Sequence, residues 1–269
     1  YFTEHLVLAT PDNGVAIAIY AACKATVKVG DGKEITLHEE TNYPFEEAIA
    51  FTVSTGEKVA FPFYLRIPSW TQKAEVRVNG KKVSAAPVAG KYLCINREWA
   101  NGDRVELTLP MSLSMRPWQV NKNSVSVDYG PLTLSLKIAE KYVEKDSRET
   151  VIGDSKWQKG ADSKKWPTTE IYPDSPWNYS LVLDKKEPLK NFKVIRKSWP
   201  TDNYPFTVAS VPLEVKAIGR PVPEWKIDET GLCGVLPEED AVKGDKEEIT
   251  LIPMGAARLR ISAFPNTKE

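Results

Sequence analysis

The chain has 269 residues, enough for two domains of ordinary size that each bury a hydrophobic core. Lysine plus arginine and aspartate plus glutamate both number 36, so no net field draws the protein to nucleic acid or to an anionic membrane. The longest strongly apolar run, residues 15–23, is less than half of the ~20 residues that a membrane-spanning helix needs. We therefore expect no nucleic-acid partner and no membrane span, and we interpret residues 15–23 as a buried strand.

Short strand patterns separated by turn residues fill the first part of the chain and are typical of sandwiches and barrels. In residues 74–83, apolar and polar residues alternate until Asn79-Gly80, a dipeptide that favours a type I′ hairpin turn. A second hairpin turn is predicted at residues 101–103, before a strand over 104–109. Further strands are predicted over residues 14–20, 35–39, 48–53 and 61–67.

The strand patterns resume after residue 118 and surround a long polar stretch. Strands are predicted over residues 124–129, 132–136, 179–183, 192–195, 213–217, 249–252 and 258–261. The stretch from about 140 to 175 is predicted to be a loop or surface excursion, and residues 237–246 a solvated loop. We predict an all-β fold of two jelly-roll-like β-sandwich domains, mostly antiparallel with little helix, over residues 1–118 and 119–269.

Motifs for catalysis are missing from the sequence. It has no G-x-S-x-G elbow and no H-E-x-x-H motif. Cys23, Cys94 and Cys233 lie far apart in the sequence, with no nearby histidine to complete a zinc site. We therefore expect inert buried thiols, and one disulfide among the three cysteines is the alternative. Three acidic clusters are interpreted as solvated surface charge; they are Glu39-Glu40, Glu46-Glu47 and Glu238-Glu239-Asp240.

Aromatic residues gather in the irregular excursion at about 140–178. They are Trp157, Trp166, Tyr172 and Trp177. Such rings either anchor an unstructured segment onto a sheet or serve as flat platforms for sugar rings. We retain the four residues as candidate sugar contacts and predict no catalytic, cofactor-binding or metal-binding residue.

Several short motifs occur together in a particular order. They are Thr41–Pro44, Leu65–Trp70, Val78–Gly80, Arg97–Trp99 with Gly102-Asp103, Tyr129–Leu132, Trp177–Leu181 and Leu251–Ile261. In this order they resemble the region that follows the catalytic barrel in the β-L-arabinofuranosidase family, glycoside hydrolase family 127 (GH127) and its relatives, of the type found in Bacteroides-type bacteria. The resemblance covers nearly the whole chain.

The resemblance implies an (α/α)6 barrel that carries catalysis, followed by two β-sandwich domains. It also implies a zinc-bound cysteine nucleophile in that barrel, and the three cysteines of this chain do not form the adjacent-cysteine motif of that site. Zinc is therefore expected only in the missing barrel. The absence of an initiating methionine also suggests a piece of a longer protein.

The resulting hypothesis is a non-catalytic C-terminal part of a glycoside hydrolase acting on arabinose-containing or related plant polysaccharide. We expect the chain alone to be inactive, its partner to be the barrel of the same polypeptide, and a plant oligosaccharide to be a further candidate partner. Family resemblance implies a periplasmic or secreted protein. The alternatives are a freestanding carbohydrate-binding module and a structural surface domain pair.

Overall fold

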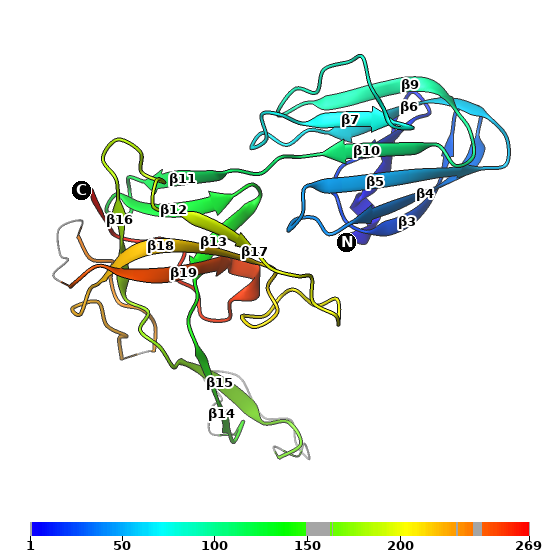
Figure 1. The fold of residues 1–269 in the computed structure, drawn as a ribbon. Coiled ribbons are helices and arrows are strands. Elements are labelled where there is room, and N and C mark those ends of the chain that lie inside the picture. Colours follow the sequence, from blue (N-terminus) through cyan, green and yellow to red (C-terminus); the bar gives the residue numbers. More distant parts are fainter. Residues whose placement is uncertain (1, 149–161, 163, 230, 239–243, 269) are drawn as a thin grey trace. The chain divides into compact units, whose positions relative to one another are not determined.

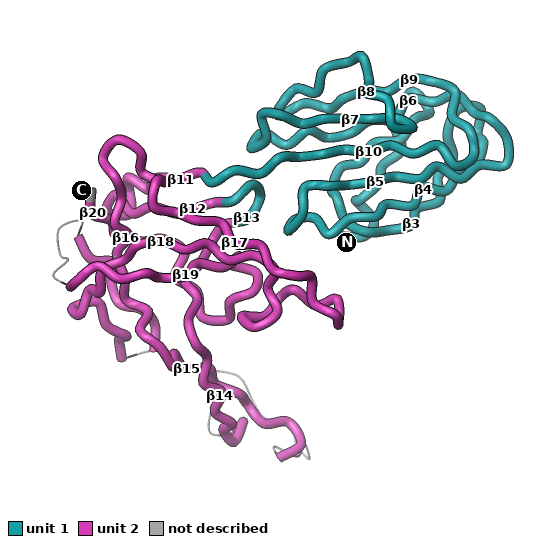
Figure 2. The backbone as a smooth tube through the Cα atoms, in the orientation of Figure 1, with its two compact units in different colours: residues 1–113, 129–132 teal, residues 114–128, 133–269 magenta. Residues whose placement is uncertain are grey.

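The computed structural model describes residues 2–148, 162, 164–229, 231–238 and 244–268. The chain forms two compact units, coloured separately in Figure 2. Unit 1 comprises residues 1–113 and 129–132, and unit 2 comprises residues 114–128 and 133–269. No helix among the described residues is long and apolar enough to cross a membrane.

Unit 1 is a sandwich of two β-sheets, which Figure 1 shows as facing layers. The four-stranded sheet has the order β1-β2-β6-β9 and the six-stranded sheet the order β3-β4-β5-β10-β7-β8. Strands β2 and β6 are parallel. The elements are η1 (Thr3–His5), β1 (Val7–Ala9), β2 (Val15–Ile17), β3 (Cys23–Val29), β4 (Lys33–Thr41), β5 (Ala48–Thr55), β6 (Val59–Arg66), β7 (Glu75–Val78), β8 (Lys81–Lys82), β9 (Tyr92–Trp99) and β10 (Arg104–Thr108).

The core of unit 1 lies between its two sheets, because each strand turns alternate side chains inward. Along β6, Phe61, Phe63 and Leu65 are at most 1% exposed. Phe63 contacts Trp99 from β9 and Phe51 from β5, with ring centroids 5.6 Å apart in both pairs. Burial of each large side chain contributes about 1.5–3 kcal/mol to folding.

The predicted turns have different outcomes. Asn79 and Gly80 have φ angles of 50° and 76°, as a type I′ turn requires, and the β7–β8 hairpin is confirmed. The second predicted hairpin is wrong, because β9 belongs to the four-stranded sheet and β10 to the six-stranded sheet. Residues 101–103 instead carry the chain from one sheet to the other. Hydrogen bonds from Val53 N to Asp103 O (2.9 Å) and from Gly102 N to Val53 O (2.8 Å) tie this corner to β5.

Unit 2 contains one eight-stranded sheet and a two-stranded hairpin. The large sheet has the order β11-β12-β13-β19-β18-β16-β20, with β17 also paired to β18, and β16 and β20 run parallel. The elements are β11 (Leu113–Trp118), β12 (Ser124–Tyr129), β13 (Leu132–Leu136), β14 (Glu140–Lys145), β15 (Thr168–Pro173), β16 (Tyr179–Leu183), β17 (Lys193–Arg196), β18 (Leu213–Pro221), β19 (Glu247–Pro253), η2 (Met254–Ala256) and β20 (Asn266–Lys268). The predicted all-β fold class, mostly antiparallel with little helix, is confirmed.

Three predicted segments differ from the structure. The run at residues 15–23 is not one strand, because β2 ends at Ile17 and β3 begins at Cys23. The polar stretch predicted as a loop contains the β14–β15 hairpin. The predicted strand over 258–261 is absent, since Ile261 is held instead by Ser135 Oγ, which accepts its N–H at 3.0 Å, and by Leu136 N, which donates to its carbonyl at 2.9 Å. Part of the predicted loop at 237–246 lies outside the described residues.

Candidate functional site

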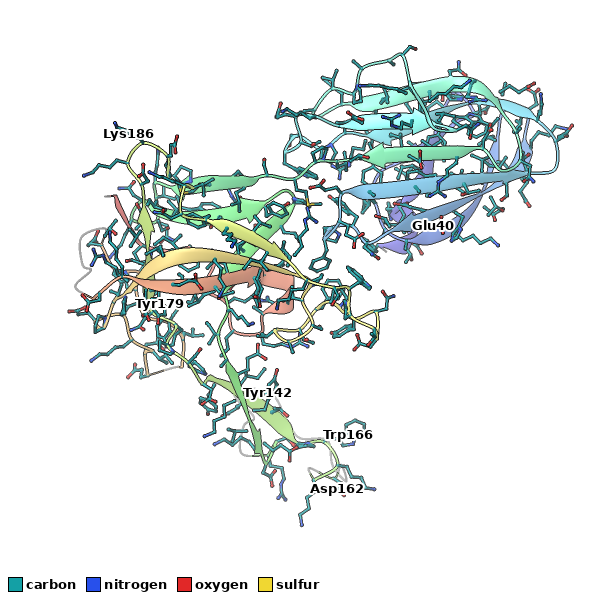
Figure 3. The ribbon with its side chains drawn as sticks, in the orientation of Figure 1. Glu40, Tyr142, Asp162, Trp166, Tyr179 and Lys186 are labelled. Atoms are coloured by element: carbon teal, nitrogen blue, oxygen red, sulfur yellow. The ribbon has the colours of Figure 1, made fainter. Side chains whose placement is uncertain are left out.

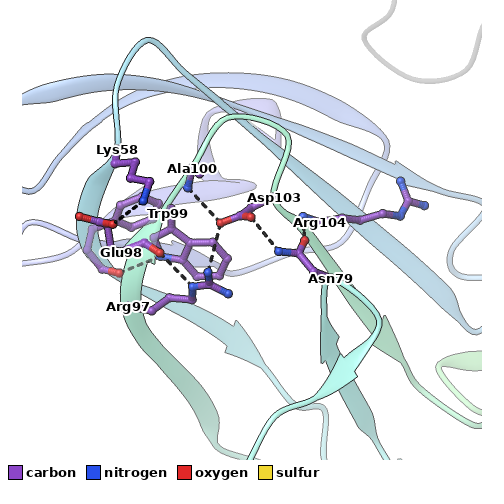
Figure 4. A network of polar contacts seen from close by, with 9 residues as sticks. Lys58, Asn79, Arg97, Glu98, Trp99, Ala100, Asp103 and Arg104 are labelled. Carbon is purple, nitrogen blue, oxygen red and sulfur yellow. Dashed lines mark hydrogen bonds and ion pairs between the residues drawn. The ribbon is translucent and has the colours of Figure 1, made fainter.

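The motif at the sheet-to-sheet corner of unit 1 has a structural role (Figure 4). The carboxylate of Asp103 accepts hydrogen bonds from Ala100 N (2.9 Å) and Asn79 Nδ2 (2.7 Å), and Arg97 Nη2 lies 3.5 Å from it. Burial opposes ionisation of Asp103, but these hydrogen bonds and the charge of Arg97 outweigh it and lower its pKa. Trp99 Nε1 donates to Phe61 O at 3.0 Å. These residues stabilise the turns, and the polar groups named here already have partners within the protein.

The cysteines do not form a reactive or metal-binding centre. All three are free thiols, and Cys23 is half-buried, while Cys94 and Cys233 are exposed. The prediction of buried thiols is therefore wrong for Cys94 and Cys233, which are both exposed. Among the described residues, no group of three or more His, Cys, Asp or Glu side chains could hold a metal ion. These residues do not fit a zinc site.

Glu39 departs from its predicted role as surface charge. It points inward from β4 and is 1% exposed. Its Oε1 accepts a hydrogen bond from Ala21 N at 3.0 Å, and Cys23 Sγ lies 3.8 Å from its Oε2. Burial raises the pKa of Glu39 to about 8, and the two hydrogen bonds oppose this shift only partly.

A raised carboxyl pKa also occurs in general acids, but Glu39 lacks the access that catalysis requires. Glu39 is so deeply buried that no substrate oxygen can reach its carboxyl group. Both of its carboxyl oxygens face groups of the protein. Tyr20, also buried, donates its hydroxyl to Arg66 O at 2.6 Å, and its pKa is raised by burial and by the nearby Glu39. We assign this cluster to the packing of unit 1.

A cavity of about 550 Å³ lies over the outward face of β4, β5, β10 and β7. Five of its six charged side chains pair with one another: Arg104 lies 3.3 Å from Glu40 and 3.4 Å from Glu106, and Arg77 lies 3.7 Å from Glu75. The sixth, Glu46, is exposed. No aromatic side chain lines it. Acidic residues outnumber arginines in this lining, and the cavity offers no platform for a sugar ring.

A second cavity, of about 370 Å³, lies in unit 2 and brings together two of the four aromatic residues singled out from the sequence. Tyr172 reaches it from β15 and Trp177 from the segment before β16. Ile227, Leu232 and the arginines at 258 and 260 form other parts of its lining. We call it the aromatic cavity.

The other two aromatic candidates lie elsewhere. Trp166 is 72% exposed and does not line the aromatic cavity; Figure 3 labels it beside the β14–β15 hairpin. Its backbone oxygen accepts a hydrogen bond from Ser147 Oγ at 2.8 Å. Trp157 lies outside the described residues. The sequence identified Tyr172 and Trp177 by their type and position, but it gave no sign of the arginines, which come from a segment predicted to be a strand.

Contacts among neighbouring residues hold the wall of the aromatic cavity in place. Trp177 packs edge-on against Trp225, with ring centroids 5.1 Å apart and an interplanar angle of 66°. Trp225 is 3% exposed and donates its Nε1–H to Gly234 O at 3.0 Å. Asn178 Nδ2 donates to Trp225 O at 3.1 Å. These bonds fix the Trp177 ring at the cavity wall.

Comparison with known proteins gives one family match and several structural relatives. Residues 14–111 match the model of the GH127 middle domain of β-L-arabinofuranosidases. Among curated proteins, no relative matches the sequence. A GH127 β-L-arabinofuranosidase from Geobacillus stearothermophilus T6 has a TM-score of 0.61 and 20% identity to this chain. A glycoside hydrolase and a GH127 β-arabinofuranosidase both have TM-scores of 0.59 and 22% identity.

The extent of these matches differs between this chain and its relatives. The three structures match 100%, 95% and 97% of this chain, which spans only 35%, 36% and 37% of their own lengths. At this identity the likeness shows a shared fold. The resemblance to GH127 is confirmed: residues 14–111 match its middle domain, and the chain shares its fold with about a third of a GH127 β-L-arabinofuranosidase and of a GH127 β-arabinofuranosidase.

Proposed function

We propose that this chain is the non-catalytic β-sandwich part of a GH127 glycoside hydrolase that acts on arabinose-containing or related plant polysaccharide. The match of residues 14–111 to the middle domain carries the proposal. The structural relatives extend well beyond the region that this chain covers, which supports a further domain in the same polypeptide. In this proposal that domain is the (α/α)6 barrel, and it holds the zinc and the catalytic residues.

The contribution of this chain would be a rigid support for the barrel. Sandwich interiors are filled by their own side chains, and the core of unit 1 follows this rule. The polar motifs that carry the family resemblance are engaged in turns, as the contacts of Asp103 illustrate. We further propose a periplasmic or secreted location, on the resemblance alone.

The test compares the 269-residue chain with the complete reading frame that contains it, using an aryl β-L-arabinofuranoside as substrate. We expect hydrolysis by the complete protein and none by the chain alone. Turnover by the chain alone that is abolished by Cys94→Ala or Cys233→Ala would overturn the non-catalytic assignment. A reading frame without a barrel upstream of Tyr1 would overturn the proposal as a whole.

A second candidate function is a freestanding carbohydrate-binding module, and the aromatic cavity is the observation that favours it. The two candidates separate on the same reading frame. An upstream barrel supports the hydrolase, whereas its absence together with saccharide binding by the chain supports the module.

A further inference from the structure

We propose that the aromatic cavity of unit 2 binds a sugar that carries a carboxylate, namely a hexuronic acid residue of a polysaccharide. This inference rests on the proposed function only in taking a saccharide as the ligand class. It does not require the barrel or any catalytic step.

The apolar walls of the aromatic cavity suit one face of a sugar ring. Tyr172 is 43% exposed and Trp177 is half-buried, so both rings have surface to offer. Ile227 and Leu232 are 44% and 66% exposed and add apolar surface to the same cavity. A volume of about 370 Å³ lies at the lower end of the ~300–1,000 Å³ of small-molecule pockets, which favours one or two sugar rings over a longer chain.

The loop that carries Ile227 and Leu232 is closed on itself. Ile227 and Cys233 form an isolated antiparallel bridge, and Asp228 N donates to Leu232 O at 2.8 Å. Gly234 N donates to Lys226 O at 2.9 Å. These bonds hold the apolar side chains at the cavity before any ligand arrives, which lowers the entropy cost of binding.

Positive charge at the aromatic cavity selects the carboxylate. Arg258 and Arg260 both line it, and none of the described lining residues is an aspartate or glutamate. Arg260 uses Nε to donate to Ala257 O at 2.9 Å, and no other polar contact of its guanidinium occurs among the described residues. A guanidinium with free N–H groups binds a carboxylate through paired, charge-assisted hydrogen bonds.

Glu140 and Glu170 already accept hydrogen bonds from residues of the cavity lining or beside it. Glu140 Oε1 accepts the Arg258 N–H at 3.0 Å, and its Oε2 accepts the Tyr142 hydroxyl at 2.5 Å. Glu170 accepts the Tyr172 hydroxyl. The Arg258 side chain bonds to the hydroxyls of Tyr204 and Tyr142, which raises its pKa. Arg260 is therefore the cation that we assign to the ligand, and Arg258 adds to the positive field.

The experiment measures binding of two matched probes to the full 269-residue chain by calorimetry. The probes are a disaccharide of galacturonic acid and a disaccharide of galactose, which differ at each ring by a carboxylate in place of a hydroxymethyl group. We expect the acidic probe to bind about tenfold more tightly, the gain expected from one good charge-assisted contact. Arg260→Gln should abolish that preference, and Tyr172→Ala should weaken the binding of both probes.

Trp166→Ala is the matched control, because it removes an exposed aromatic residue of the same excursion that does not line the cavity. It should bind both probes as the parent does. Equal affinity for the two probes, an unchanged preference in Arg260→Gln, or an equal loss in Trp166→Ala would overturn the inference. Each of these results leaves the hydrolase proposal standing, since that proposal depends on the upstream reading frame and on hydrolysis.

Discussion

Glu39 carries its carboxyl group inside unit 1, where burial raises its pKa from the ordinary value of 4.5 to about 8. Because folding favours the protonated form, the contribution of Glu39 to stability is fully present below pH 4.5. It is lost as the pH rises from about 4.5 to about 8, at about 1.4 kcal/mol per pH unit. We expect Glu39→Gln to remove this dependence, since the amide stays neutral and its oxygen can still accept the Ala21 N–H.

Urea unfolding of unit 1 at pH 5, 6.5 and 8 measures this effect. The parent chain should lose stability across the series, and Glu39→Gln should lose much less. Glu40→Gln is the control, because Glu40 is the exposed neighbour on the same strand and should follow the parent. If Glu39→Gln retained the slope of the parent, the buried carboxyl would not be its source.

The sequence could predict only part of the behaviour of Glu39. Neighbours on a strand face opposite sides, so the Glu39-Glu40 pair implies one side chain on each face of β4. Which of the two is inside depends on register with Cys23 on β3 and Phe51 on β5. The buried carboxyl of Glu39 also needs a hydrogen-bond donor, and Ala21 supplies it. Because Ala21 lies between β2 and β3, outside the sheets, its N–H can donate to Glu39.

At the scale of elements, Asp103 joins two turns that the sequence presents as separate. Its side chain links the β9–β10 corner to Asn79 of the β7–β8 hairpin, and Asn79 Oδ1 in turn accepts the Arg104 N–H at 2.8 Å. Asp103→Ala would leave the Ala100 N–H, the Asn79 amide and Arg97 without this partner. We expect a loss of about 2–3 kcal/mol in the free energy of unfolding, measured in denaturant.

Glu98→Ala provides the control within the same network. Glu98 pairs with Lys58 at 3.3 Å, but both side chains are at least 60% exposed, so the pair contributes less than about 1 kcal/mol. A loss in Glu98→Ala as large as that in Asp103→Ala would mean that surface charge, and not the buried network, stabilises the corner.

Several elements were predictable from local pattern, and others depend on distant partners. Alternation placed Val105, Leu107 and Leu109 on the core side, and all three are at most 1% exposed. The hairpin prediction at residues 101–103 failed because turn chemistry defines a reversal of the chain but not the sheet that the next strand joins. Residues 258–261 have a strand-like pattern, yet their backbone partners come from the Ser135 side chain and Leu136.

The candidate site was predictable only as far as residue type allows. Trp177 and Tyr172 stood out as aromatic residues in a polar stretch, and both reach the aromatic cavity. Arg260 and Leu232 are more than 50 residues further along the chain and carry no local signal of binding. Their assembly depends on the closed loop around Trp225, which is a property of the folded unit.

At the scale of the whole molecule, the main cluster of buried hydrophobic residues in unit 1 comes from residues 15–109. Unit 2 buries its own set of side chains, which includes Phe264 and Leu251, both unexposed. Units with separate cores can unfold separately. We therefore expect calorimetry to resolve two transitions, each of which responds to substitutions in one unit only.

Trp99→Ala and Phe264→Ala form the matched pair for this test, because each removes a fully buried aromatic side chain from one core. Truncations of this kind cost about 3–5 kcal/mol. Trp99→Ala should lower the midpoint of one transition and leave the other in place, and Phe264→Ala should do the reverse. A single transition whose midpoint both substitutions lower would show that the two cores unfold as one cooperative unit, because destabilising either core would then unfold the other with it.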